Sequence, residues 1–82
     1  MMNVTDMEEV WRTEDSIRSV VEAAAGLSAW ELSFDTVTGC YHLELDGHLT
    51  EEQAIDLCAQ FYISADYDGE GSHGSLFTLR NE

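Results

Sequence analysis

The sequence predicts an α+β fold, a small α-β-β-α-β domain in which two helices pack on one face of a three-stranded antiparallel or mixed sheet. Two adjacent segments alternate apolar and polar residues around a glycine-containing turn, which indicates a β-hairpin. Two other segments repeat apolar residues at helical spacing. The chain has 82 residues and a hydrophobic content of 44%, so residues 1–82 are expected to form a single domain with one core.

The main first helix is expected at about residues 13–25. Thr13 begins a sequence typical of a helix start, and Gly26 suits a left-handed cap at the helix end. A second capping sequence begins at Thr5, which leaves open a single helix from about that residue. The stripe expected to face the core is Ile17, Val20, Val21 and Ala24.

Arg18 lies four residues from both Glu14 and Glu22, so it is expected to pair with them across the exposed side of this helix. The apolar residues that precede the helix are Met7, Val10 and Trp11. They extend the core or a contact with a partner, and the core is favoured for Trp11.

A hairpin is expected at about residues 29–46, with the loop at residues 36–39. Side chains alternate between the two faces of a strand, so each strand has an apolar and a polar face. The expected apolar pairs across the hairpin are Phe34 with Tyr41, Leu32 with Leu43, and Trp30 with Leu45. A slip of one residue would move one apolar row to the other face, so this register is favoured.

The same register places Glu31 opposite Glu44 on the polar face. Like charges directly opposite each other destabilise a sheet. No Lys or Arg occurs in the hairpin, so two interpretations remain open. The face is either a solvated outer surface or a carboxylate surface whose neutralising cations come from a partner.

A second helix is expected at about residues 50–64, because Thr50 and Gln53 form a capping box. Its expected buried stripe is Ala54, Leu57, Cys58, Phe61 and Ala65. A glycine-rich loop is expected at residues 66–74 and a last strand at about residues 75–80, with Phe77 and Leu79 facing the core. If the second and last strands are parallel, their crossover is right-handed and the strand order is 2-1-3.

The segment from Asp66 to Gly71 resembles the first half of an EF-hand calcium loop, with acids at alternate positions and a glycine at the sixth. The resemblance ends there, because Phe77 occupies the position of the bidentate glutamate. We therefore expect an acidic loop, no metal and no cofactor. The three histidines have no ligand spacing, and Cys40 and Cys58 are expected to be thiols. No catalytic motif occurs, so we expect no enzymatic activity.

The charge is strongly negative: 17 acids stand against three arginines and no lysine, giving a formal net charge of −14. This charge excludes direct binding of nucleic acid and attraction to an anionic membrane, since both require cations. It fits a partner with a basic surface, adaptation to a salt-rich cytoplasm, or plain solubility. No membrane span and no signal-peptide pattern are found, so a cytoplasmic location is expected.

The favoured function is a small protein-binding inhibitor that mimics nucleic acid, with carboxylates in place of phosphates. In size, acidity and lack of catalytic residues, the chain resembles in composition the phage-encoded anti-CRISPR and anti-restriction proteins that act in a host cytoplasm. The expected partner is therefore a basic nucleic-acid-binding protein or complex, such as a nuclease or a CRISPR effector. The expected contact residues are Glu31, Asp35, Glu44 and Asp46, extended by Glu14, Asp15, Glu52, Asp56, Asp66, Asp68 and Glu70.

Two alternatives remain. One is another kind of binding module, such as an antitoxin, an immunity protein, a secretion chaperone or a homodimer, with Trp11, Trp30 and Tyr67 as anchors if they are exposed. The other is an ordinary small domain of a halophile, for which the acidity is an adaptation to salt.

Overall fold

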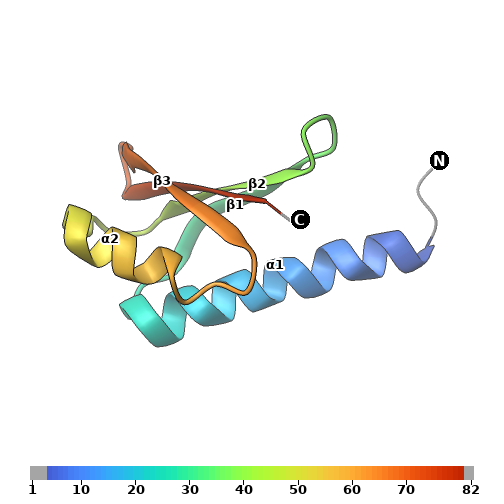
Figure 1. The fold of residues 1–82 in the computed structure, drawn as a ribbon, viewed down its shortest axis with the longest axis horizontal. Coiled ribbons are helices and arrows are strands. Elements are labelled where there is room, and N and C mark those ends of the chain that lie inside the picture. The colour runs from blue at the N-terminus through green and yellow to red at the C-terminus, as the bar shows by residue number, and fades with distance from the viewer. Residues whose placement is uncertain (1–3, 81–82) are drawn as a thin grey trace.

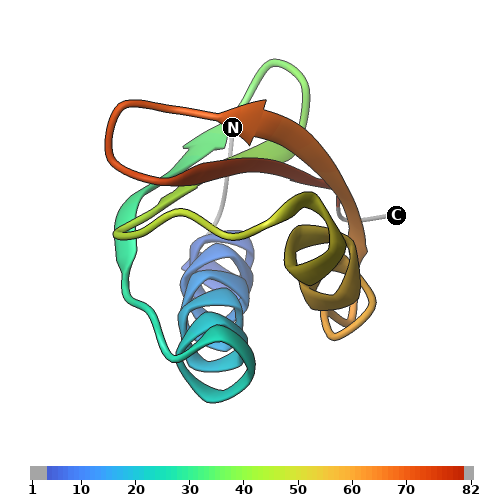
Figure 2. The ribbon, with the colours of Figure 1, turned by 90° about the vertical axis from the view of Figure 1, so that its left-hand side faces the viewer.

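The computed structural model describes the backbone of residues 4–80 and the side chains of residues 12–80. The elements are α1 (Val4–Ala25), β1 (Ala29–Asp35), β2 (Cys40–Leu45), α2 (Glu51–Cys58), β3 (Ser64–Glu70) and β4 (Ser75–Arg80). The strands form one antiparallel sheet in the order β1-β2-β4-β3, and both helices lie under the same face of it (Figures 1 and 2). The α+β class is confirmed, as is the packing of two helices on one face.

The prediction of three strands is wrong, because most of the segment expected to be a loop forms β3 and a hairpin with β4. The acids and Gly69 of this segment have low strand propensity. Its burial nonetheless alternates, with Ala65 and Tyr67 turned toward the core. The Tyr67 ring lies 5.6 Å from that of Phe77 on the neighbouring strand. Contacts with β4 therefore override the local preference of the chain.

The order 2-1-3, expected if the second and last strands were parallel, is not found, because these strands are antiparallel. β1 lies at an edge of the sheet, and β2 pairs antiparallel with β4. The extra strand explains the difference. The chain passes from β2 through α2 to β3 at the far edge and returns through a hairpin to β4 beside β2.

α1 begins at Val4 instead of near residue 13, which agrees with the alternative of one continuous helix. Ile17 and Val21 are buried as predicted, whereas Ala24 is exposed. The helix ends before Gly26, whose φ of 67° is the predicted left-handed cap. Among the described side chains, no ion pair within 4.0 Å joins Arg18 to a carboxylate. The side chains of Met7, Val10 and Trp11 lie outside those described. No described helix is long and apolar enough to cross a membrane.

The capping box of α2 is confirmed: the Gln53 amide donates to Thr50 Oγ1 over 3.1 Å, and the Thr50 amide donates to Gln53 Oε1 over 3.0 Å. The helix ends at Cys58 and not near residue 64. The Gln60 amide then bonds to the Leu57 carbonyl, which tightens the last turn. Phe61 and Ala65 contact the core from outside the helix, with Ala65 on β3.

The β1–β2 register is largely confirmed, with Phe34 opposite Tyr41 and Leu32 opposite Leu43. The predicted pair of Trp30 and Leu45 is wrong, because a bulge at Trp30 places Ala29 opposite Leu45 instead. The loop at residues 36–39 is confirmed, and Gly39 has the expected positive φ of 72°.

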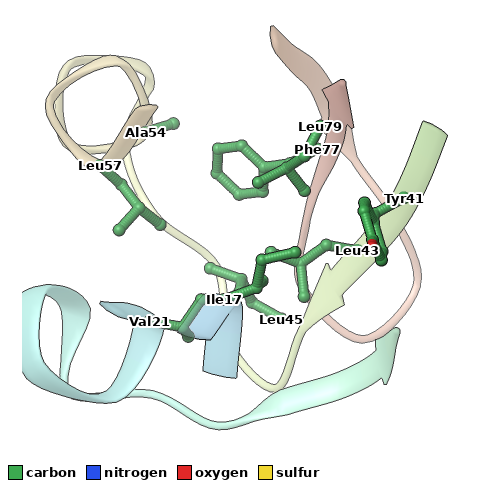
Figure 3. Close-up of a cluster of buried hydrophobic side chains, with 9 residues drawn as sticks. All are labelled: Ile17, Val21, Tyr41, Leu43, Leu45, Ala54, Leu57, Phe77 and Leu79. Carbon is green, nitrogen blue, oxygen red and sulfur yellow. The ribbon is translucent and has the colours of Figure 1, made fainter. Parts of the chain in front are cut away.

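The core fills the space between the inner sheet face and the helices (Figure 3). Its buried residues are Ile17, Val21, Tyr41, Leu43, Leu45, Ala54, Leu57, Phe77 and Leu79. All the apolar residues that β2 and β4 direct inward belong to this cluster. Both α1 and α2 lie on that side, and no helix of residues 4–80 lies over the opposite face of the sheet (Figure 2).

Candidate functional site

The sheet face turned away from α1 and α2 carries most of the candidate residues, and we call it the outer face. Strand alternation and register assign to it Glu31, Ser33, Asp35, Cys40, His42, Glu44, Ser64, Asp66, Asp68, Leu76, Thr78 and Arg80. Trp30 joins them because it is exposed beside Glu31 at an irregularity of the register. Carboxylates thus come from β1, β2 and β3, and Arg80 is the one guanidinium on this face among the described residues. The face therefore has a marked excess of negative charge.

A shallow depression of about 300 Å³ lies at the middle of the outer face. The residues that line it include Glu31 from β1, Glu44 from β2 and Asp68 from β3, with Leu76 among its apolar residues. The sheet thus brings together three of the predicted acids from positions far apart in the chain.

The predicted facing pair of Glu31 and Glu44 is confirmed by the register, but the two carboxylates have different surroundings. Glu44 Oε2 accepts hydrogen bonds from the backbone amides of His73, at 2.7 Å, and Gly74, at 3.3 Å. The His73 Nδ1 atom lies 3.5 Å from the same oxygen. Glu31 is exposed, and its carboxylate makes no hydrogen bond or ion pair within the described part of the chain. Glu44 therefore holds the β3–β4 loop on the sheet, while the Glu31 carboxylate is exposed to solvent.

Asp35 stabilises the β1–β2 turn. Its Oδ1 atom accepts from the amides of Val37 at 2.9 Å and Thr38 at 3.4 Å. These backbone donors lower the pKa of the Asp35 carboxyl, and the nearby His42 acts in the same direction. A carboxylate in this position closes a turn by bonding to amides that follow it, which is why aspartate favours turns.

Two further acids of the outer face have partners on β4. Asp66 forms an ion pair with Arg80, in which Asp66 Oδ2 and Arg80 Nη2 are 3.0 Å apart. Asp68 Oδ2 accepts a hydrogen bond from the Thr78 hydroxyl. Both carboxylates remain exposed, so they are oriented by the sheet without being covered.

Glu70 does not belong to the outer face, contrary to the expectation that it adds to one acidic surface. It accepts hydrogen bonds from the Tyr67 hydroxyl and, over 2.9 Å, from the Ser75 hydroxyl, and its Oε1 atom lies 2.8 Å from His48 Nδ1. Ser75 is fully buried and also accepts from the Leu49 amide just before α2. Glu70 therefore joins the β3–β4 hairpin to the segment that starts α2.

These hydrogen bonds shift the pKa values of Glu70 and Tyr67. The Tyr67 hydroxyl, followed by the contacts to His48 and Ser75, lowers the pKa of Glu70. The hydrogen bond to Glu70 raises the pKa of Tyr67 to about 12, because ionisation would place two negative charges side by side. The Ser75 hydroxyl donates to Glu70 and is fully buried, so its oxygen is not exposed at the surface.

The acids of the helices do not extend the outer face as predicted. Glu14 and Asp15 lie on α1, and Glu52 and Asp56 on α2, so the core and the sheet separate these helices from the outer face (Figure 2). Asp46 is exposed directly after β2. A groove of about 360 Å³ lies between the helices. Among its described lining residues Asp56 alone is charged, and the others have small, apolar or amide side chains.

Sequence reasoning missed the orientation of Trp30 and the role of His73. The Trp30 ring is stacked on the His73 ring, with centroids 3.9 Å apart and planes 13° from parallel. Trp30 retains 54% of its exposed area. A weak signal was present: Ala29, Trp30 and Leu32 are all apolar, and this break in alternation is compatible with a bulge.

Within residues 12–80, no group of three or more His, Cys, Asp or Glu side chains is arranged to hold a metal ion. Cys40 and Cys58 are free thiols, and burial, together with the charges of Asp66 and Asp68, raises the pKa of Cys58. No protein-family model matches the chain, and comparisons with curated proteins and with solved structures give no significant match.

Proposed function

We propose that this protein is a small inhibitor that binds a basic surface of a nucleic-acid-binding protein and takes the place of nucleic acid there. One observation carries the proposal: in the described part of the chain no helix covers the outer face, which combines Glu31, Glu44, Asp35, Asp66 and Asp68 with one arginine, Arg80. The proposed partner is a nuclease or a CRISPR effector in the cytoplasm, the class of target bound by anti-CRISPR and anti-restriction inhibitors.

The spacing of the sheet supports this proposal. Residues two apart on a strand are about 6.6 Å apart and neighbouring strands about 4.8 Å apart. Carboxylates at these intervals form a two-dimensional array of the same order as the spacing of phosphates. Lys and Arg side chains in the nucleic-acid-binding groove of a partner would contact negative carboxylates where they normally contact phosphates. The long-range attraction would speed association at low salt.

The internal contacts of the acids also support it. Asp66, Asp68 and Glu44 are held by hydrogen bonds or an ion pair, so a partner need not order these side chains on binding. Ordering a flexible side chain at an interface costs about 0.5–1.5 kcal/mol, and fixed carboxylates avoid part of that cost. Glu31 supplies an accessible charge beside them, while the acids on α1 and α2 add to the overall negative field.

Affinity capture with a matched charge reversal tests the proposal. The protein is immobilised, exposed to a bacterial lysate at low salt and eluted with a salt gradient. We expect elution of nucleic-acid-binding proteins, and added duplex DNA should release the same proteins. Glu31→Lys should move their elution to lower salt. Glu52→Lys changes the net charge equally on the helical side and should have a smaller effect.

A capture that yields no protein at low ionic strength contradicts the proposal, and so does equal loss of binding in the two variants. Reversal of Glu44 is unsuitable for this purpose, because it would also release the loop that Glu44 holds. Thermal unfolding at increasing salt tests the halophile alternative. A domain that is unfolded at low salt and folds only at molar salt would assign the acidity to salt adaptation.

A further inference from the structure

An aromatic pair lies at the margin of the outer face. Trp30 comes from edge strand β1 and His73 from the loop between β3 and β4. Their rings are stacked with centroids 3.9 Å apart, yet Trp30 remains 54% exposed. The His73 ring thus packs against the Trp30 indole, and the rest of the indole surface is accessible to a partner.

The bulge in β1 is what directs Trp30 to this position. The register shifts between Ala29 and Glu31, and both Trp30 and Glu31 are exposed in succession. Regular alternation would have turned Trp30 inward opposite Leu45. Bulges commonly redirect a side chain beside a functional site. Exposed tryptophans are also among the residues that contribute most to protein interfaces.

The charges near the pair favour a cation as its occupant. Glu31 follows Trp30 in the chain and is exposed, and Glu44 contacts both the amide and the ring of His73. A nucleobase could stack on the indole, but its phosphates would approach a protein with a formal net charge of −14. An apolar side chain would leave the Glu31 carboxylate without a partner. A guanidinium can stack on an indole and hydrogen-bond to a carboxylate at the same time.

We infer that the Trp30–His73 stack is the anchor for an arginine side chain of the partner protein. The guanidinium lies on the exposed surface of the Trp30 indole and donates hydrogen bonds to Glu31. This inference rests on the proposed function and identifies a chemical preference within it. A purely electrostatic surface treats lysine and arginine alike at the same charge, whereas a stacked site prefers the planar guanidinium.

The test compares two peptides of equal charge. Labelled octa-arginine and octalysine are titrated with the purified full-length protein at low, fixed ionic strength, and binding is followed by fluorescence anisotropy. We expect octa-arginine to bind about tenfold more tightly, the scale of one cation–π contact. Trp30→Leu should abolish this preference while octalysine binding changes little, and Trp30→Phe should retain part of it. Circular dichroism checks that each variant is folded.

Glu31→Gln and Glu52→Gln form the matched control, since both remove one exposed carboxylate. Glu31→Gln should reduce the arginine preference, and Glu52→Gln should leave it unchanged. Equal affinity for the two peptides overturns the inference, as does a preference that survives Trp30→Leu. Binding of labelled octathymidylate that is lost in Trp30→Leu would identify a base-stacking site and overturn it too.

The peptide titrations distinguish a missing arginine anchor from a missing acidic docking surface. Tight, salt-sensitive binding of both peptides without an arginine preference removes the anchor and leaves the acidic docking surface in place. If neither peptide binds, both the arginine anchor and the acidic docking surface are contradicted.

Discussion

The two hairpins of the sheet are held together in different ways. In β1–β2 the turn is closed locally: Asp35 bonds to amides two and three residues later, and Phe34 and Tyr41 pack across the strands with ring centroids 4.8 Å apart. In β3–β4 the loop is held by distant groups, because Glu44 on β2 binds the amides of His73 and Gly74. The first turn is closed by its own residues alone, whereas the second loop, which also has a backbone bond from the Gly71 amide to the Gly74 carbonyl, is held in addition by a residue of another strand.

This difference indicates how the acids are used. A carboxylate within a local turn affects only its own hairpin. Glu44 and Glu70 instead connect elements, because Glu44 joins β2 to the β3–β4 loop and Glu70 joins that hairpin to His48 before α2. Much of the negative charge near β3–β4 therefore has a structural role, which the composition alone does not reveal.

The largest expected difference between the hairpins comes from their loop glycines. A Cβ atom on Gly74 would lie 2.0 Å from the Leu45 carbonyl oxygen and 2.3 Å from that of Gly47. Both are backbone atoms that cannot move aside, so Gly74→Ala should destabilise the protein by about 3 kcal/mol or more. Gly39→Ala meets no atom within 4 Å and is opposed only by its φ of 72°, at a cost of about 1–2 kcal/mol. Urea unfolding measures both, and equal losses would contradict the contrast.

A smaller difference is expected within the facing pair of acids. Glu44→Ala should destabilise the protein by about 2 kcal/mol, since two backbone amides lose a charged acceptor. Glu31→Ala should be neutral or should stabilise by about 0.5 kcal/mol or less, because it removes a like charge opposite Glu44. Chemical denaturation gives both values. In a Trp11→Phe background, where Trp30 is the one tryptophan left in the sequence, its fluorescence should report loosening of the His73 loop in Glu44→Ala alone. Similar losses in the two variants would show that Glu44 does not hold the loop.

The smallest effect is expected from acid titration. The pKa values of Asp35 and Glu70 are both lowered in the folded protein. Their contributions are therefore complete above the unfolded-state pKa values near 4 and are lost as the pH falls through the folded values. Asp35→Asn and Glu70→Gln should each flatten the fall in melting temperature below about pH 4. Hydrogen exchange should place the Asp35 effect in β1–β2 and the Glu70 effect in β3–β4 and α2; the reverse pattern would contradict this assignment.

The parts of the fold that the sequence predicts are those with local causes. The Thr50–Gln53 box, the Gly26 cap and the pairing of Leu32 with Leu43 depend on residues close together in the chain, and all are confirmed. β3 was missed because its strand character comes from pairing with β4, against the preference of its acids and glycine.

In the candidate site, too, the features with local causes could be predicted and those that depend on distant contacts could not. The opposition of Glu31 and Glu44 follows from hairpin register and was predicted correctly. The partners of these residues could not be predicted, because His73 lies near Glu44 and Trp30 only when β4 is paired with β2 in the same sheet. The bulge that exposes Trp30 likewise depends on backbone pairing, and its sequence signal is weak: two adjacent apolar residues, Ala29 and Trp30.

The positions of the two bulges have a consequence for the behaviour of the protein at high concentration. Each lies on an edge strand, one at Trp30 in β1 and the other at Asp68 in β3. An exposed edge with regular amides can recruit a strand from another molecule and begin aggregation. A bulge interrupts that row of donors and acceptors, and the neighbouring carboxylates of Glu31 and Asp68 repel a second copy. The sheet thus ends at both edges in strands that are poor templates for fibril growth.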